Sequence, residues 1–462
     1  MNRKLQQTFA FACLPAAVAN ATIAAIVAGF ACQPAASASA AELPVPKISE
    51  VLRLNPGERP GPALGQTSTY ILKTSPRATL GDAYVIITDF TDDAFLKALD
   101  KLAAFHHGSV VRVQNLAALS STSASASTST SASASAGASA KTEREQLMAK
   151  LRELKPKFVA IAPRPESYTD DLLPGIWKTL AALDNKSRVP QLPVFPGLLV
   201  APNQAAFEAL VERSINHKPQ PAPQVRPFVV GQIINPTPNG MRSLQKVRMM
   251  RALFGDCGTA PARSLVVRSY SAVQSGANFA SAPDEWRADV PGPAVSVEAI
   301  PTPAKQALDD ASLLIMFGHG RPGEVCSIDV RAFRDVNMAG KVVLCGDCFT
   351  APRTAPQTAD ATPAKRAGPK MSPRKGMDNS FAMRAVQNGA AVVYAHMREN
   401  AGFPHLFPVL ENWTDGLTVG EAYQRLMNAI LAGGPGPGAG GDRLLYVIIG
   451  DPALQPFEKM KK

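Results

Sequence analysis

Short apolar runs of strand length alternate with segments of helical spacing along most of this chain. Residues 84–88 form the first apolar run, residues 92–106 carry apolar side chains at helical intervals, and residues 110–113 form a second run. A strand, a helix and a second strand in this order form a βαβ unit, which joins neighbouring parallel strands. The sequence therefore predicts an α/β fold built on a mostly parallel sheet.

The alternation continues to near residue 450 and divides into two blocks, over 79–218 and 225–457, with prolines between Pro219 and Pro223 marking the break. Further strands are predicted over 158–161, 198–200, 228–230, 264–268, 312–317, 341–345, 390–394 and 444–449. Further helices are predicted over 141–154, 169–183, 203–216, 241–254, 379–388 and 417–431. We expect each block to form one α/β subdomain.

The first 40 residues have the pattern of an export signal. Arg3 and Lys4 precede an uncharged Ala-rich stretch, and Ala38-Ser39-Ala40 offers a small-residue cleavage site. We therefore expect an exported protein, whether secreted, periplasmic or in the cell envelope. Pro15 and Asn20 interrupt a long apolar run, so an uncleaved membrane anchor is the alternative interpretation, and membrane contact is expected only in that case.

Two further segments have compositions that do not favour packing. Residues 41–78 are rich in proline and are interpreted as a linker. Residues 117–140 consist almost entirely of Ala, Ser and Thr, which offer too little apolar surface to offset the entropy of ordering. We predict a disordered insert there, within the first block.

Charge and cysteine content exclude some functions. The formal charge of +11 comes without a dense Lys/Arg stripe interleaved with aromatic residues, so nucleic acid is not a predicted partner. Of six cysteines, Cys13 and Cys32 lie in the export segment, and four in so long a chain cannot form a dense disulfide framework. Cys345 and Cys348 are spaced as a CxxC pair, but no second pair completes a zinc site. A thiol–disulfide pair is one alternative, and a single reactive cysteine is the other.

A histidine and a cysteine follow two of the predicted buried strands. The run over 312–317 ends in Gly318-His319-Gly320, and the run over 341–345 ends in Gly346-Asp347-Cys348. Catalytic sites of open α/β sheets form at such carboxyl ends of parallel strands. An imidazole near a thiol can act as its base, and main-chain N–H groups can hold an oxyanion. We predict His319 as general base, Cys348 as nucleophile, and the N–H groups of Gly320 and Cys348 as the oxyanion hole.

This pattern resembles the caspase, legumain and gingipain clan of cysteine peptidases, and gingipains in particular. Residues 156–161 resemble the gingipain central non-catalytic strand, and 195–214 the strand and helix that follow it. The segment 446–454 resembles the closing strand with its Gly-Asp-Pro-x-Leu motif. The resemblance implies a caspase-like three-layer α/β/α fold, a non-catalytic first block, and a cysteine endopeptidase whose polypeptide substrate forms an acyl-enzyme on Cys348 rather than Cys345.

The chain departs from the family pattern at several positions. Asp347 stands where relatives commonly have alanine, and a carboxylate beside the nucleophile opposes thiolate formation. Arg164 and Pro165 stand where relatives often carry an acidic cluster, so structural calcium is compatible with the family but not indicated here, and no cofactor or metal is predicted. The alternative function is therefore a catalytically inactive, gingipain-like scaffold or peptide-binding protein of the cell envelope.

Other residues have more limited expectations attached to them. Glu324 and Asp329 could orient the imidazole of His319, and His396 could contribute to a substrate pocket. The basic, Pro-rich segment over 350–376 is either a solvated loop beside the cleft or a processing site. His106 follows a helix beside a second histidine, and we expect a surface pair. Neither the residue preferred at the cleavage site nor the oligomeric state can be predicted.

Overall fold

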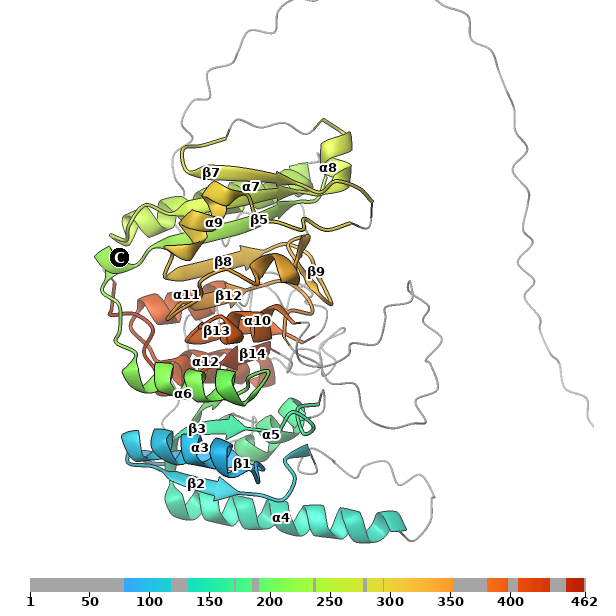
Figure 1. Ribbon diagram of the computed structural model, residues 1–462. Helices are drawn as coiled ribbons and strands as arrows, with labels where there is room; N and C mark the ends of the chain where they lie inside the picture. Colours follow the sequence, from blue (N-terminus) through green and yellow to red (C-terminus); the bar gives the residue numbers. More distant parts are fainter. Residues whose placement is uncertain are drawn as a thin grey trace, which may run out of the picture. The chain divides into compact units, whose positions relative to one another are not determined.

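The computed structural model describes residues 79–117, 132–169, 172–184, 191–235, 238–276, 281–293, 295–351, 380–397, 406–432 and 446–460 (Figure 1). The predicted export signal and the linker over 41–78 lie outside these residues. So do residues 118–131 of the predicted insert and residues 352–376 of the basic segment, for which a solvated loop and a processing site are the two alternatives.

The strands of both blocks join one 11-stranded sheet. In spatial order they are β2 (Ser109–Arg112), β1 (Ala83–Thr88), β3 (Pro156–Ala162), β4 (Phe195–Leu198), β14 (Tyr446–Ile449), β13 (Val392–His396), β12 (Val342–Cys345), β8 (Leu313–Phe317), β5 (Pro227–Ile233), β6 (Arg263–Arg268) and β7 (Glu285–Asp289). Strand β14 is antiparallel to β13 and meets β4 at a single pair, Ile449 with Leu198. Within each block the other neighbouring strands are parallel.

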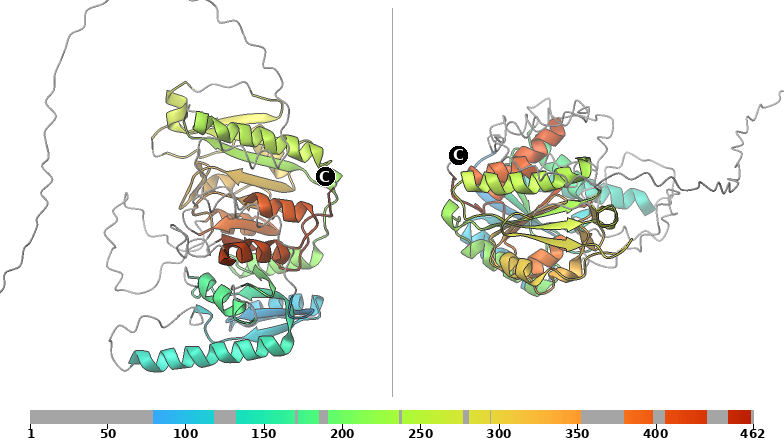
Figure 2. Two further views of the ribbon diagram at one scale, coloured as in Figure 1. Left: turned by 180° about the vertical axis from the view of Figure 1, so that it is seen from behind. Right: turned by 90° about the horizontal axis from the view of Figure 1, so that it is seen from above.

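Helices lie on both sides of the strands, as the view from above in Figure 2 shows. They are α3 (Asp93–Phe105), α4 (Ala132–Leu154), α5 (Leu172–Ala181), α6 (Gln204–Asn216), α7 (Pro238–Asp256), α8 (Tyr270–Gln274), α9 (Thr302–Asp309), α10 (Phe381–Gln387), α11 (Leu406–Thr414) and α12 (Val419–Ala432). The predicted α/β fold with a mostly parallel sheet is confirmed. Among the described residues, no helix combines the length and apolar character that crossing a membrane requires.

Several local predictions were wrong or incomplete. Helix α4 begins at Ala132, so it extends into residues predicted to be a disordered insert. Strand β13 ends at His396, two residues beyond its predicted end, because both faces of the run are buried up to that point. The edge strand β7 has the sequence Glu-Trp-Arg-Ala-Asp, which has no apolar run to reveal it. Helix α11 was also missed.

Strands β8 and β12 owe their place at the centre of the second block to uninterrupted apolar sequences. Every residue of both strands is buried, as expected for parallel strands covered on two faces. They pair in parallel from Val342 with Leu313 to Cys345 with Met316. Their carboxyl ends therefore lie at one edge of the sheet, next to the end of β13 on one side and the end of β5 on the other.

A buried carboxylate after β14 links the two blocks. Asp451 accepts a hydrogen bond from the hydroxyl of Tyr84 in β1 (2.8 Å), and its other oxygen lies 2.7 Å from Nε2 of His106, after α3. The main-chain N–H of Ala453 also donates to Asp451 (3.0 Å). His106 stacks on Tyr84 with ring centroids 4.2 Å apart. The expectation of a surface histidine pair was therefore wrong for His106, because its partner lies 345 residues further along the chain.

A buried lysine directly before β12 gives the stability of the fold a pH dependence. The ammonium of Lys341 donates to the carbonyl oxygen of Asp309 (2.9 Å) and to that of Ala311, and the residue is 1% exposed. Burial lowers the pKa of Lys341 from 10.5 to about 8. Because the unfolded chain then binds more protons than the folded chain between these two values, the contribution of this group to stability rises with pH across that window.

We expect Lys341→Met to isolate this effect. Between about pH 8 and pH 10, the free energy of unfolding of the wild type should rise relative to that of the variant by about 2 kcal/mol. Urea denaturation at several pH values measures the difference in unfolding free energy between the wild type and the variant. The titration of buried tyrosines and cysteines is common to both proteins, so it cancels in this difference. The exposed Lys97, replaced by methionine in the same way, is the control and should show no such trend. A constant difference for Lys341→Met would contradict the assignment.

Candidate active site

The turn after β8 carries His319, and a glutamine from the neighbouring strand holds it. The side-chain oxygen of Gln232, in β5, accepts a hydrogen bond from the main-chain N–H of His319 (2.7 Å). The amide nitrogen of Gln232 donates to the hydroxyl of Ser327 (2.5 Å). Gln232 is 3% exposed, whereas His319 is exposed to solvent. The backbone of His319 is thus fixed, while the residue is accessible to solvent.

The turn after β12 carries Cys348. Phe349, the next residue, has a left-handed backbone with φ of 56°, and the Thr350 hydroxyl donates to the carbonyl oxygen of Asp347 (3.0 Å). Non-glycine residues in this conformation are strained and cluster at functional sites. Of the four cysteines described, none is in a disulfide, and Cys348 alone is not buried. Burial raises the pKa of Cys345, which makes it a poor nucleophile.

The two turns are in direct contact. A Cβ atom placed on Gly320 would lie 1.9 Å from the main-chain oxygen of Cys348 and 3.0 Å from the Cβ of Asp347. No side chain fits there, so glycine at 320 is required for the turn after His319 to lie against the turn of Cys348. The structure therefore brings the turn that carries His319 and Gly320 against the turn that carries Cys348, at one edge of the sheet.

The two carboxylates expected near His319 lie in a small hairpin sheet formed by β9 (Gly320–Arg321), β10 (Glu324–Val325) and β11 (Ile328–Asp329). Glu324 accepts a hydrogen bond from the hydroxyl of Ser296 (2.8 Å). Asp329 caps the short 3-10 helix that follows and pairs with Arg331. Within the described residues, no hydrogen bond joins either carboxylate to the imidazole, so the orienting role predicted for them finds no support in these contacts.

His396 also differs from expectation. It is the last residue of β13, is 1% exposed, and packs on the ring of Tyr446 with centroids 4.5 Å apart. Its main-chain N–H donates to the hydroxyl of Thr350 (3.2 Å), and its carbonyl oxygen accepts from Ala351 (3.0 Å). Because its side chain is buried, the contacts of His396 support the turn that follows Cys348 rather than a surface pocket.

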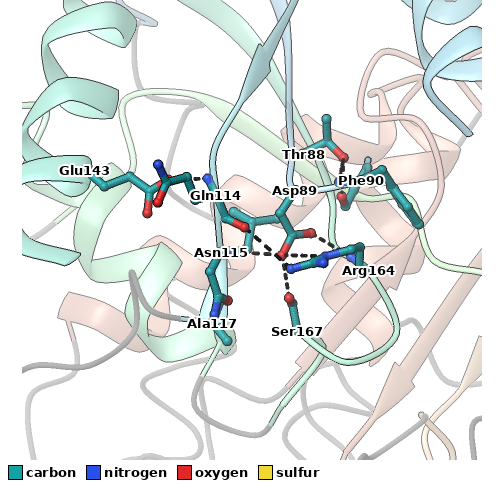
Figure 3. A network of polar contacts seen from close by, with 11 residues as sticks. Thr88, Asp89, Phe90, Gln114, Asn115, Ala117, Glu143, Arg164 and Ser167 are labelled. Atoms are coloured by element: carbon teal, nitrogen blue, oxygen red, sulfur yellow. Dashed lines mark hydrogen bonds and ion pairs between the residues drawn. The ribbon is translucent and has the colours of Figure 1, made fainter. Parts of the chain in front are cut away.

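Among the described residues, the corresponding edge of the first block has no such pair of a histidine and a cysteine. Asp89, directly after β1, is buried and accepts hydrogen bonds from the main-chain N–H groups of Leu116 (3.1 Å) and Arg164 (2.8 Å) and from the hydroxyl of Ser167. Figure 3 shows Arg164 and Ser167 around Asp89, with the guanidinium of Arg164 beside the carboxylate. These hydrogen bonds join the segments that follow β1, β2 and β3 to the carboxylate of Asp89.

A groove of about 810 Å³ lies near that network, between β2 and α4. Its lining includes Phe90, Arg112, Gln114, Glu143 and Lys150, but neither histidine nor cysteine. A search of the described residues for three or more histidine, cysteine or carboxylate side chains placed to bind a metal ion found none.

Comparison with known proteins shows that this chain resembles solved structures in its fold. No protein-family model matches the chain, and no curated protein sequence matches it. A crystal structure of the Arg-specific cysteine proteinase gingipain R is similar over 83% of this chain and 80% of that chain, with 10% identity and a TM-score of 0.50. The chain therefore has a gingipain-like α/β fold, and an identity this low shows the fold alone.

Two other solved structures match less well. The complex of the pro- and mature domains of Porphyromonas gingivalis RgpB covers 81% of this chain and 79% of that chain, with 11% identity and a TM-score of 0.47. The Saccharomyces cerevisiae separase–securin complex covers 63% of this chain and 15% of that chain, with 12% identity and a TM-score of 0.35.

Proposed function

We propose that this protein is an exported cysteine endopeptidase in which Cys348 is the nucleophile and His319 the general base. The observation that carries the proposal is the contact between the two turns, in which Gly320 packs on the main chain of Cys348. Cys348 is also the one described cysteine that is not buried. The gingipain-like fold supports this placement at the level of architecture.

The proposed reaction divides peptide hydrolysis into two steps. His319 accepts the thiol proton, the Cys348 sulfur attacks the carbonyl carbon of the substrate, and the N–H groups of Gly320 and Cys348 stabilise the oxyanion. His319 then donates the proton to the leaving amine as the C–N bond breaks, which leaves an acyl-enzyme. In the second step, water loses a proton to His319 and attacks the thioester carbonyl, which releases the acid and restores the thiol.

Labelling with an electrophilic peptide ketone tests the assignment of the nucleophile. We expect the wild type and Cys345→Ala to take up the label and Cys348→Ala to take up none, with the site identified by mass spectrometry. Cys345 is a matched control, because it lies three residues away but is buried in β12. Libraries of peptide ketones with different side chains next to the reactive carbonyl should be used, because the preferred residue is unknown.

The possible results separate the proposal from the inactive scaffold. A folded wild-type protein that reacts with no ketone and cleaves no member of a mixed peptide library would be a scaffold or peptide-binding protein. Label on Cys345 in place of Cys348 would contradict the assigned nucleophile but not the fold.

A further inference from the structure

The carboxylate of Asp347 lies inside the protein, beneath the two turns of the candidate active site. Asp347 is fully buried, although its neighbour Cys348 is partly exposed. Its Oδ2 accepts a hydrogen bond from the main-chain N–H of Cys326 (2.7 Å). Burial of a carboxylate lowers the stability of a protein unless the group is paired or hydrogen-bonded. The presence of Asp347 at this buried position therefore points to a role that offsets its cost in stability.

The hairpin turn that Asp347 contacts is strained. Cys326 and Ser327 connect β10 to β11, and both have left-handed backbones, with φ of 49° and 57°. Two such residues form the turn geometry that favours Asn-Gly, so a Cys-Ser pair must be held in it by other contacts. Asp347 binds the N–H of Cys326, and Gln232 binds the hydroxyl of Ser327. Asp347 belongs to the turn of Cys348, and Gln232 also binds the main-chain N–H of His319.

The charged and titratable groups around Asp347 come from every turn of the site. Burial raises the pKa of Asp347, whereas the thiol and main-chain N–H of Cys326, the amide of Gly318 and the charge of His319 oppose that rise. The carboxylate in turn contributes, after burial, to the raised pKa of Cys326 and of Cys345. Asp347 is therefore coupled electrostatically to the imidazole as well as bonded to the hairpin.

We propose that Asp347 is a positioning residue, which ties the turn of Cys348 to the hairpin at Cys326 and whose negative charge sets the pH range in which Cys348 reacts. Asp347 stands directly before the proposed nucleophile, so its negative charge opposes formation of the thiolate. This effect moves the range in which Cys348 reacts toward higher pH. This inference rests on the proposed function in one respect, because it takes Cys348 and His319 as the reacting pair.

The test is the rate of alkylation of Cys348 by iodoacetamide as a function of pH, followed by mass spectrometry of the peptide that contains Cys348. It requires no peptidase activity. We expect Asp347→Asn, which keeps an oxygen for the N–H of Cys326 but loses the charge, to shift the profile to lower pH by about one unit. The exposed Asp335, in the connection between β8 and β12, changed to asparagine, is the matched control and should leave the profile in place.

The position of the profile on the pH axis distinguishes a role of the charge from a general loss of structure. A profile that becomes lower in amplitude without moving, in a variant shown to be folded by its urea midpoint, would overturn the inference. If Asp347→Asn does not fold, Asp347→Ala, which also lacks the charge, is measured in its place with the same expectation. His319→Ala serves separately: an unchanged alkylation rate in that variant would count against the proposed dyad, whatever Asp347 does.

Discussion

Replacement of His319 by alanine is expected to lower kcat/KM for peptide hydrolysis about 1,000-fold, the largest effect that we predict for any single side chain other than Cys348. General acid–base catalysis contributes about 100- to 10,000-fold, and His319 is proposed to move the proton in both steps. Since His319 is exposed and its main-chain N–H, not its imidazole, holds the contact with Gln232, the substitution should leave the fold intact. Steady-state hydrolysis of the best library peptide measures the loss.

The exposed His107 provides the matched control for this experiment. Its backbone is left-handed, with φ of 51°, so asparagine, which tolerates that conformation, is the appropriate replacement. His107→Asn should retain wild-type activity. Full activity in His319→Ala would contradict the proposed catalytic dyad. If His319→Ala loses its fold as well as its activity, as detected by circular dichroism, His319→Gln is measured in its place.

The second large effect concerns stability. Asp451→Ala is expected to lower the free energy of unfolding by about 3 kcal/mol, because it leaves the buried hydroxyl of Tyr84 and the ring nitrogen of His106 without their shared acceptor. Asp451 lies between elements far apart in the sequence, so the loss should affect both blocks. Chemical denaturation followed by far-UV circular dichroism measures it.

Two further variants make this prediction specific. Asp451→Asn keeps an oxygen for Tyr84 and should lose less stability than Asp451→Ala. Asp100, exposed on α3, the helix that His106 follows, is the control for a change from aspartate to alanine and should alter stability by less than about 0.5 kcal/mol. Equal stability of the wild type and Asp451→Ala would show that the contact between the blocks depends on apolar packing alone.

Sequence patterns predicted the buried strands better than the edge strand β7. The run over 312–317 was recognisable because parallel strands covered on both faces are apolar throughout, and β8 occupies Leu313–Phe317. Strand β7, with one unpaired edge, has charged residues at both ends and gives no comparable signal. The three short strands of the hairpin sheet are two residues each, too short for any period to appear.

Some residues of the candidate site could also be predicted from the sequence, and others could not. His319 and Cys348 were found because each follows an apolar strand, and chain topology alone brings the ends of neighbouring parallel strands together. Gln232 was missed, although a polar residue near the end of the apolar strand β5 was an available signal. The inward position of Asp347 could not be predicted, because it depends on a hydrogen bond to Cys326 across the hairpin rather than on local sequence. The pairing of His106 with Asp451 was hidden for the same reason.

Strand β14 lies between β4 and β13, yet it is synthesised after every other described strand of the sheet. A nascent chain still attached to the ribosome before this segment emerges therefore has two open strand edges, each able to capture another polypeptide. We expect such intermediates to depend on chaperones. Truncations just before residue 446 should accumulate as aggregates rather than as slightly weakened monomers.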